Sequence, residues 1–422
     1  MEREDLYYVL QDQQKEFEEI SGLIDRDITP SIIKLIPLRM PLIITGIRRC
    51  GKSSLLSILK TKLKVGKKEY IYVNFNDERL INFKTDDFQK IMDYLEENDY
   101  KKNTFFLLDE IQEATGWEKW VDRIRNKYPI ILTGSNSKLL SKEISTILTG
   151  RSISINLLPF SFKEFLRYKK VDYEPWDLKI QSKIRHNLMK FLQEGGFPQK
   201  VITGKKVILP ELYENILYRD IIKRFNKNMV KPIKEISLFL ISNITSDISF
   251  RSLSKMAQVT NISTIKEIIH SFESAFVFFF VSKFDYSIRK QSQSPKKVYC
   301  IDNGFITTLG FKFSHNRGKL LENLVAVELN NMKKEFYYHK NEKKEECDFL
   351  IKDKLRISQA IQVCFELNEK NRQRELKGLL GAMNKFKIKE GLILTYDQKE
   401  DIKVGKKVIK VLPISEWLLK DP

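Results

Sequence analysis

The sequence has few cysteines and no long hydrophobic run, and both absences exclude classes of protein. Its four cysteines are scattered through 422 residues without a C-x-x-C pair, so neither a disulfide framework nor a zinc ribbon is expected. The most apolar stretch, residues 275–281, is far shorter than the ~18 residues that a membrane-spanning helix requires. The N-terminus is charged and periodic, unlike a signal peptide. The sequence therefore predicts a cytoplasmic protein that is not embedded in a membrane.

Length and charge carry further information. A chain of 422 residues is too long for a single hydrophobic core, since such cores stop growing near ~250–300 residues. Several domains are therefore expected. The formal net charge of +19 favours polyanionic partners such as nucleic acid, nucleotides or anionic lipid. The alternative is a lysine-rich proteome in which every protein surface is basic.

Apolar segments alternate with helical segments in the N-terminal part of the chain. Residues 4–20 predict an amphipathic helix whose apolar face carries Leu6, Leu10, Phe17 and Ile20. Near-continuous apolar segments then predict buried strands at 42–45, 70–75, 104–110, 129–134 and 152–157. Such strands, separated by helices, are typical of a parallel sheet covered on both faces. From about residue 161 the strand signal gives way to helices, which are broken by the turn Gly195-Gly196-Phe197-Pro198.

One segment matches the phosphate-binding pattern G-x-x-x-x-G-K-[ST]. It reads Gly46, Ile47, Arg48, Arg49, Cys50, Gly51, Lys52 and Ser53, and Ser54 follows it. The segment comes directly after a predicted buried strand and opens a predicted helix, which is the context that this motif requires. Its glycines let backbone N–H groups converge on phosphate oxygens at the positive end of the helix. We predict that these residues bind ATP, with Lys52 at the β- and γ-phosphates and Ser53 as a ligand of Mg²⁺.

Two acids end the third predicted strand. Asp109 is placed to hold Mg²⁺ in the manner of a Walker-B acid. Glu110 is then placed to polarise the attacking water. A solvated turn is the alternative for such a pair, but the phosphate-binding loop favours the catalytic interpretation.

Polar residues near the later strands supply further candidates. Ser135 or Asn136, which follow the fourth strand, would lie next to the γ-phosphate and position the water. A plain turn is the alternative. Arg151 precedes the fifth strand, and a guanidinium there can act as an arginine finger across a subunit boundary. An ordinary surface arginine is the alternative.

Together these motifs resemble a known family. They look like the motifs of AAA+ ATPases of the AAA_14 type, which carry a C-terminal DUF4143 region; the segments are GIRRCGKSSLL, FFLLDEIQ, ILTGSNSKLL, LTGRSISINLLPFSFKEF and GGFP. The resemblance covers almost the whole chain. It implies the strand order 5-1-4-3-2, a helical lid after Phe160 and a sensor at Ser135 or Asn136. It also implies a homo-oligomer in which Arg151 completes a neighbour's site.

The region between residues 219 and 297 has many more lysines and arginines than acids. It contains two short helices joined by a tight turn, with inward positions at Leu253, Met256, Ala257, Ile265, Ile268, Ile269 and Phe272. This pattern is typical of a helix-turn-helix, whose second helix offers polar residues to the major groove. Two strands and a basic loop would form a wing. We predict contacts to double-stranded DNA by Asn261, Ser263, Thr264, Lys266, Arg289, Lys290 and Lys296, and a protein-interaction or packing module is the alternative.

The last hundred residues resemble the PD-(D/E)XK nuclease fold. Such sites surround Mg²⁺ with acids from a helix and two strands, and a lysine lies beside the attacking water. Glu322 and Asp348 are the first two candidate acids, but the expected D/E-x-K is Gln362-Val363-Cys364. Glu366, on the predicted strand face of Gln362, is a candidate substitute. We expect a degenerate site on a fold retained for DNA docking or for structure, rather than active cleavage.

These interpretations define a fold class and a function. We predict an α/β chain with a P-loop NTPase (AAA+) parallel sheet, a helical lid, a winged helix and a C-terminal restriction-endonuclease-like domain. The predicted boundaries are an N-terminal helical arm at 1–35, an ATPase core at 36–160, a lid at 161–230, a winged helix at 231–315 and the last domain at 316–422. The favoured function is a Mg²⁺-dependent ATPase that couples its nucleotide state to DNA interaction or oligomer rearrangement. The alternatives are an ATP-regulated DNA nuclease and a nucleotide-switched protein-interaction scaffold.

Overall fold

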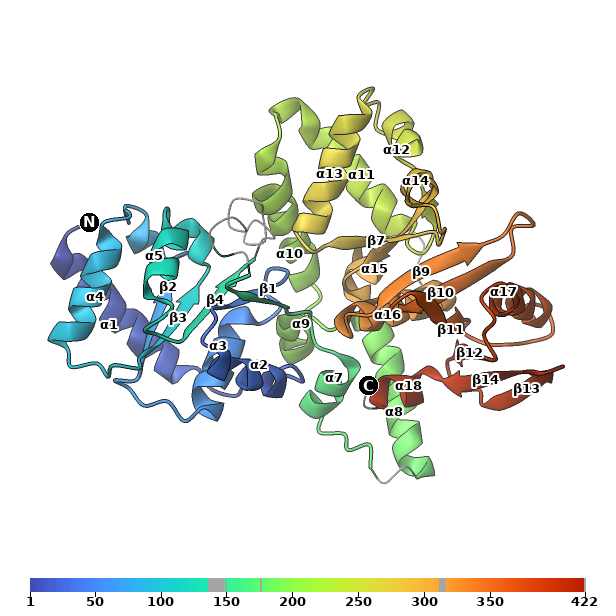
Figure 1. The fold of residues 1–422 in the computed structure, drawn as a ribbon, viewed down its shortest axis with the longest axis horizontal. Coiled ribbons are helices and arrows are strands. Elements are labelled where there is room, and N and C mark those ends of the chain that lie inside the picture. Colours follow the sequence, from blue (N-terminus) through green and yellow to red (C-terminus); the bar gives the residue numbers. More distant parts are fainter. Residues whose placement is uncertain (136–147, 149, 175–176, 311–315, 421–422) are drawn as a thin grey trace. The chain divides into compact units, whose positions relative to one another are not determined.

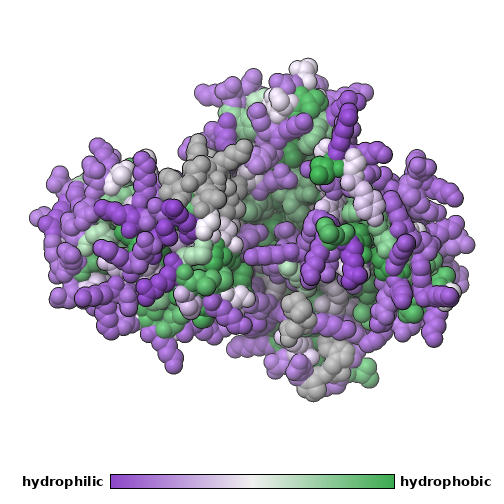
Figure 2. Space-filling view, in the orientation of Figure 1, coloured by the Kyte–Doolittle hydropathy of each residue, from purple (hydrophilic) through white to green (hydrophobic). Residues whose placement is uncertain are grey.

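The computed structural model describes residues 1–135, 148, 150–174, 177–310 and 316–420. The chain divides into unit 1, which is Met1–Pro159 with Ser274–Phe276, and unit 2, which is Phe160–Glu273 with Val277–Pro422. Hydrophilic residues cover most of the surface of each unit in the view of Figure 2. In the described part of the chain no helix has the length and apolar character needed to cross a membrane. The finer five-part division stays a prediction.

Unit 1 is built on a five-stranded parallel sheet (Figure 1). Its strands are β1 (Leu42–Thr45), β2 (Tyr70–Asn74), β3 (Phe105–Asp109), β4 (Ile130–Gly134) and β5 (Ile153–Asn156). They lie in the order β2-β3-β4-β1-β5, and every neighbouring pair is parallel. The predicted P-loop NTPase sheet and its strand order are therefore confirmed.

Helices cover both faces of this sheet. They are α1 (Arg3–Glu19), α2 (Thr29–Leu35), α3 (Lys52–Lys62), α4 (Asp87–Glu97) and α5 (Trp117–Ile124), with short 3-10 turns at Ile36–Leu38, Glu78–Leu80 and Ile111–Glu113. On one face, α1, α4 and α5 pack their apolar stripes into a single core with alternate strand residues. The rings of Phe88 and Trp120 stack within that core at 4.4 Å. Helix α3 packs against β3 and β4, with Leu55 and Leu59 buried.

Helix α1 also satisfies the open edge of the sheet. The Gln14 amide accepts a hydrogen bond of 3.1 Å from Tyr72 N and donates one of 3.4 Å to Tyr70 O. The Gln13 amide accepts from Asn74 N at 2.9 Å and donates to Asn74 O at 3.1 Å. Strand β2 is an edge strand, so these side chains replace the missing neighbouring strand. The sequence pattern was wrong about Ile20, which lies beyond the helix end and is exposed.

Unit 2 begins with helices. They are α7 (Phe162–Tyr168), α8 (Leu178–Glu194), α9 (Pro198–Thr203) and α10 (Ile208–Ile216). Ser161 and Glu164 form a capping box at the start of α7. Helix α10 continues into a π turn at Leu217–Ile221 and a 3-10 turn at Ile222–Arg224.

The predicted turn at Gly195-Gly196 is required by close backbone packing. Gly195 has φ +75°, and a Cβ there would lie 1.9 Å from Asp302 Oδ1. A Cβ on Gly196 would lie 2.3 Å from Phe160 O. Gly196 N donates a hydrogen bond of 2.6 Å to Asp302 Oδ2, and Gly304 N donates one of 2.8 Å to Asp302 Oδ1. Asp302 therefore ties the turn to a distant part of the chain.

The basic middle region folds as helices with a small antiparallel sheet. Its elements are α11 (Val230–Ser242), β6 (Asp247–Ile248), α12 (Phe250–Met256), α13 (Ile262–Ser274), β7 (Phe278–Ser282), α14 (Ile288–Gln293) and β8 (Lys296–Cys300), followed by α15 (Asn303–Leu309). The strands pair in the order β6-β8-β7. The segment predicted as an open basic loop contains α14, because the Ser287 hydroxyl caps it by accepting a hydrogen bond from Lys290 N.

A six-stranded mixed sheet completes unit 2. Helix α16 (Arg317–Asn331) precedes it, and the remaining elements are β9 (Glu335–Lys340), β10 (Glu346–Asp353), β11 (Arg356–Val363), α17 (Arg372–Lys385), β12 (Glu390–Thr395), β13 (Glu400–Val404), β14 (Lys407–Pro413) and α18 (Ile414–Leu419). The strand order is β13-β14-β12-β11-β10-β9. Strands β11, β12 and β14 run parallel, and the outer pairs are antiparallel. An additional α/β sheet region therefore follows the P-loop fold, as predicted.

Candidate functional site

The phosphate-binding loop joins β1 to α3 and is folded around its own lysine. Lys52 is buried, and its Nζ donates hydrogen bonds to Gly46 O at 3.1 Å and to Ile47 O at 3.3 Å. Gly51 has φ +102°, a conformation that L side chains rarely adopt. A Cβ on Gly46 would lie 2.2 Å from Leu157 O. Both glycines of the motif are thus required by the local backbone.

An arginine that the sequence pattern did not single out fixes the same loop. The Arg26 guanidinium is buried and donates to Cys50 O at 3.0 Å and to Leu158 O at 2.7 Å. It therefore links the phosphate-binding loop to the segment that follows β5. Cys50 itself is buried, and burial raises the pKa of its thiol. Nothing in the sequence around Arg26 signals this interaction, because its partners are backbone carbonyls far along the chain.

Asp109 lies at the end of β3 with hydrogen-bond donors around its carboxylate. Tyr72 OH donates to Oδ2 at 3.0 Å, and the Thr133 hydroxyl donates to Oδ1. Burial raises the pKa of Asp109. Hydrogen bonds from Ser53, Thr133 and Tyr72 lower it, but burial has the larger effect. The Ser53 hydrogen bond brings the two predicted magnesium ligands together. Tyr72 and Thr133 are polar positions in apolar strands, which is the one sequence signal that could have identified them.

Glu110 adopts a left-handed backbone conformation, with φ +48°. Its carboxylate lies 3.6 Å from Lys52 Nζ and accepts hydrogen bonds from Ser135 N at 3.1 Å and from Gln112 Nε2 at 2.6 Å. Burial opposes ionisation of Glu110, but Lys52 and these donors outweigh it and lower its pKa. Glu110 is therefore a fixed carboxylate facing the phosphate-binding loop.

Comparison with known proteins was made with this geometry in hand. A family model for an AAA domain, AAA_14, matches residues 38–166, and models for two domains of unknown function, DUF8612 and DUF4143, match residues 185–316 and 317–417. An uncharacterized protein of Methanocaldococcus jannaschii, MJ1544, is 35% identical over 416 residues, covering 94% of this chain and 91% of that protein. The chain belongs to the AAA_14 family with a C-terminal DUF4143 region. Its P-loop fold is of the AAA type.

The chain is also similar to a second curated protein and to a solved structure. An uncharacterized protein of Haemophilus influenzae is 30% identical over 392 residues, covering 90% of this chain and 94% of that protein. The Walker-type ATPase PABY2304 of Pyrococcus abyssi aligns with a TM-score of 0.43 and 14% identity, over 68% of this chain and 96% of that structure.

The other residues predicted to act at the phosphate-binding loop can now be placed. Ser135 is buried, and its backbone N–H donates a hydrogen bond to the Glu110 carboxylate. Asn136 lies outside the described residues. The Arg151 side chain is 54% exposed, and its Nη1 lies 3.5 Å from Asp122 Oδ1. Arg48 and Arg49 lie in the loop, Gly51 is the N-cap of α3 and Ser54 lies in its first turn, and their contacts with ATP stay a prediction.

The DNA-contact candidates lie on the outside of the middle region. Ser263, Lys266, Arg289 and Lys290 are exposed, and Thr264 and Lys296 are half-buried. The predicted inward residues are buried except Met256, which is half-buried. The Asn261 side-chain oxygen accepts from Ser263 N at 2.9 Å and from Ser263 Oγ at 2.7 Å, so Asn261 fixes the start of α13.

The C-terminal candidates surround a lysine that the sequence analysis missed. Lys297, from β8, is 2% exposed, and its Nζ lies 2.9 Å from Glu322, 2.6 Å from Glu346 and 3.3 Å from Asp348. Burial opposes its charge, but Glu322 and the other acids raise the pKa of Lys297 well above its usual range. Because Lys297 comes from the small three-stranded sheet, no local pattern in the last hundred residues could reveal it.

Gln362 has a partner other than the expected one. Strand β11 ends at Val363, so Glu366 lies beyond the strand and is exposed, and its predicted alignment with Gln362 is wrong. Gln362 Nε2 instead donates a hydrogen bond of 2.7 Å to the buried Glu375 of α17. Within the described residues, no group of three or more histidine, cysteine or acidic side chains is arranged to hold a metal ion.

Proposed function

We propose that the AAA_14 part of this protein binds ATP with Mg²⁺ and hydrolyses it. The observation that supports this most directly is the 3.6 Å approach of Lys52 Nζ to Glu110, since it brings the phosphate-binding loop and the strand-end acids to one place. In the proposal, Lys52 leaves its two loop carbonyls and binds the β- and γ-phosphates. The oxygen donors of Ser53 and Asp109 suit Mg²⁺, which neutralises phosphate charge when bound. Glu110 orients the attacking water and accepts its proton.

Calorimetric titration of Mg·ATP, followed by a phosphate-release assay, tests this proposal. Wild type should bind and turn over ATP, and Lys52→Ala should lose both, because the phosphates lose their buried cation. Lys62→Ala is the matched control, since it removes an exposed lysine at the other end of α3. Wild type that gives no heat, or Lys52→Ala that hydrolyses ATP normally, contradicts the proposal.

We also propose that the nucleotide state is coupled to duplex DNA bound by the middle region as a winged helix. The exposed Lys266 and Arg289, and the net charge of +19, support this. Lys266→Glu with Arg289→Glu should weaken binding and reduce the slope of log affinity against log salt by about one for each phosphate that is no longer neutralised. A salt-independent association, or ATP turnover that is insensitive to DNA, would instead support the scaffold alternative.

Arg151 is proposed to act on a neighbouring subunit, which its exposure permits. Arg151→Ala and Lys52→Ala should each be inactive alone. Mixed in an oligomer, they should recover part of the turnover, because one subunit supplies an intact loop and the other an intact arginine. Asp122→Asn, which removes the Arg151 partner within the chain, is the control that should stay active. No recovery on mixing, in a preparation shown to be oligomeric, rejects the shared site.

A further inference from the structure

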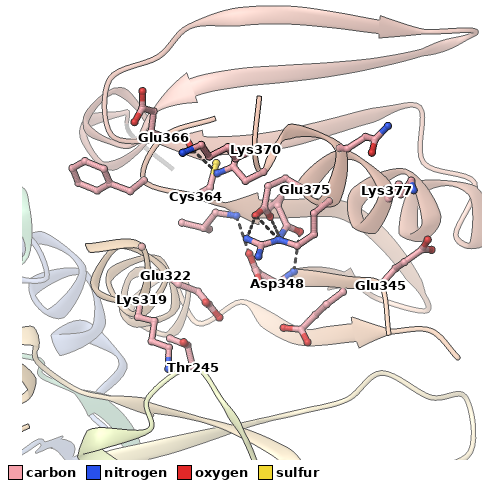
Figure 3. Close-up of a pocket in the computed structure, with 18 of the residues that line it drawn as sticks. Thr245, Lys319, Glu322, Glu345, Asp348, Cys364, Glu366, Lys370, Glu375 and Lys377 are labelled. Atoms are coloured by element: carbon pink, nitrogen blue, oxygen red, sulfur yellow. Dashed lines mark hydrogen bonds and ion pairs between the residues drawn. The ribbon is translucent and has the colours of Figure 1, made fainter. Parts of the chain in front are cut away.

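Unit 2 contains a cavity of about 1010 Å³ beside the C-terminal sheet. It is lined by residues of β8, α16, β10, the β9–β10 turn, the segment after β11, and α17. Figure 3 shows Asp348, Glu322 and Glu375 in its middle, with Lys319, Lys370 and Lys377 around them. The cavity thus has an acidic floor and a rim on which lysines outnumber acids.

Cations from within the chain compensate most of the negative charge of the floor. Lys297 Nζ bonds one oxygen each of Glu322, Glu346 and Asp348, and Lys340 bonds Glu346 at 3.1 Å. Tyr299 OH donates a further hydrogen bond of 2.9 Å to Glu322, and Val363 N donates one of 2.9 Å to Asp348.

The neighbouring Glu375 is compensated in the same way. It pairs with Arg374 and accepts a hydrogen bond from Gln362. The acids of the floor therefore already have donors, and the Lys297 ammonium lies among three of the carboxylates.

The rim has the opposite character. Lys343, Lys344, Lys370 and Lys377 are exposed, and in the part of the chain that the structure describes none of them has an ion-pair partner. These lysines come from the β9–β10 turn, the loop before α17 and α17 itself. Glu345 and Glu366 also line the cavity, but Glu345 is held by Asn341 at 2.7 Å. Available positive charge thus lies in several places around a floor whose acids are largely compensated by Lys297, Lys340 and Arg374.

We propose that this cavity binds the phosphodiester backbone of duplex DNA without cleaving it, with Lys297 as the fixed cation of its floor. Lysines spaced around an open cavity match a ligand with charges repeated along its length. Lys297, Lys340 and Arg374 offset most of the negative charge of the floor, which weakens its repulsion of phosphates, and Lys297 occupies the position between three of the carboxylates. This surface is separate from the predicted winged-helix contacts, and the proposal does not depend on the ATP site.

Charge reversal on the full-length chain tests the rim. Lys344→Glu, Lys370→Glu and Lys377→Glu together should weaken binding of labelled duplex DNA by about 10-fold or more and lower the salt slope by about one for each phosphate that the rim no longer binds. The matched control reverses Lys389, Lys403 and Lys406, which are exposed on the same sheet region and do not line the cavity. Equal weakening in both triple variants, or a rim variant that binds normally, overturns the proposal.

Lys297→Gln tests the floor in the same assay. In EDTA this variant should bind DNA more weakly than wild type, because uncompensated carboxylates repel phosphate. Mn²⁺ should restore binding by taking the vacated position, and it should leave wild-type affinity unchanged. Absence of rescue in a variant with wild-type circular dichroism overturns the role of Lys297.

Two further measurements separate this site from a nuclease site and from a general polyanion site. Wild type should not nick supercoiled plasmid in Mg²⁺ or Mn²⁺; nicking that Asp348→Ala abolishes would make the cavity a nuclease site and overturn the proposal. Inorganic polyphosphate or anionic vesicles that bind through the rim as tightly as DNA would also overturn it. The two triple variants should also be compared in a Lys52→Ala background. The rim variant should bind DNA more weakly than the control there too, whether or not the protein hydrolyses ATP.

Discussion

Tyr72 OH donates a hydrogen bond of 3.0 Å to Asp109 Oδ2 from the neighbouring strand. Burial and the negative Asp109 raise the pKa of Tyr72 well above its usual range, so the phenol remains a donor. The Thr133 hydroxyl holds the other carboxylate oxygen. The proposed magnesium ligand therefore has its orientation fixed by residues on both flanking strands, β2 and β4.

Tyr72→Phe should raise the Mg²⁺ concentration that gives half-maximal ATP turnover by about 10-fold. The reason is that residues bonded to a metal ligand fix its orientation and so increase its affinity for the metal. The measurement is the half-saturating Mg²⁺ concentration at fixed ATP. Tyr70→Phe is the control, since its hydroxyl lies on the same strand but bonds Glu18 at 3.4 Å. A similar Mg²⁺ requirement in both variants would contradict the role of Tyr72 in orienting Asp109.

Glu110→Gln should bind Mg·ATP normally but hydrolyse it at least ~100-fold more slowly, because an amide cannot accept the proton of the attacking water. Binding is measured by calorimetry and turnover by phosphate release. Glu113→Gln changes an exposed acid of the same turn and should keep wild-type turnover. Normal hydrolysis by Glu110→Gln would remove Glu110 from its proposed role.

Gln14→Ala should expose the edge of the sheet. The truncated side chain leaves Tyr72 N and Tyr70 O without their partner from α1, at a cost of about 1–3 kcal/mol where the groups stay buried. Hydrogen exchange of the β2 amides should accelerate, and the unfolding midpoint of unit 1 should fall. Lys15→Ala changes the adjacent exposed position and should do neither. Unchanged β2 exchange in Gln14→Ala would contradict the edge-capping role.

The stability of unit 2 should depend on pH through Asp302. Burial raises its pKa from 3.8 to about 6, despite hydrogen bonds from Gly196 and Gly304. The folded state therefore holds this proton more tightly than the unfolded chain does. Stability from this group is greatest below pH ~4 and is lost as pH rises through about 6, by roughly 3 kcal/mol at ~1.4 kcal/mol per pKa unit.

Urea unfolding at several pH values between 4 and 7 measures this loss. Asp302→Asn should be less stable than wild type, because the backbone N–H of Gly196 or Gly304 then faces the NH2 group of the amide. The variant should not lose stability between pH 4 and 7 as wild type does. Asp397→Asn, at an exposed position, should retain the wild-type pH profile. A pH profile that is the same with and without Asp302 would show that its proton is not linked to folding.

By itself the sequence determined the P-loop fold of unit 1. Its strands, the loop at Gly46–Ser53 and the acids at Asp109 and Glu110 were predictable because each depends on a short local pattern. The spacing of hydrophobic residues and the composition of a loop are set by residues close together in the chain. They can therefore be recognised without knowing the tertiary structure. The Gly195-Gly196 turn was predictable for the same reason, although its partner Asp302 was not.

Only the tertiary structure decided the interactions between segments far apart in the chain. It placed Arg26 on the phosphate-binding loop and Gln14 on the sheet edge, and it brought Lys297 among the acids of the C-terminal region. A lysine is attracted to whichever carboxylates the fold brings within a few ångströms, and sequence separation does not enter that energy. The segment Gln362-Val363-Cys364 lacks the lysine expected in this motif. Its sequence could not predict that Lys297 would lie beside these acids, because Lys297 comes from another sheet.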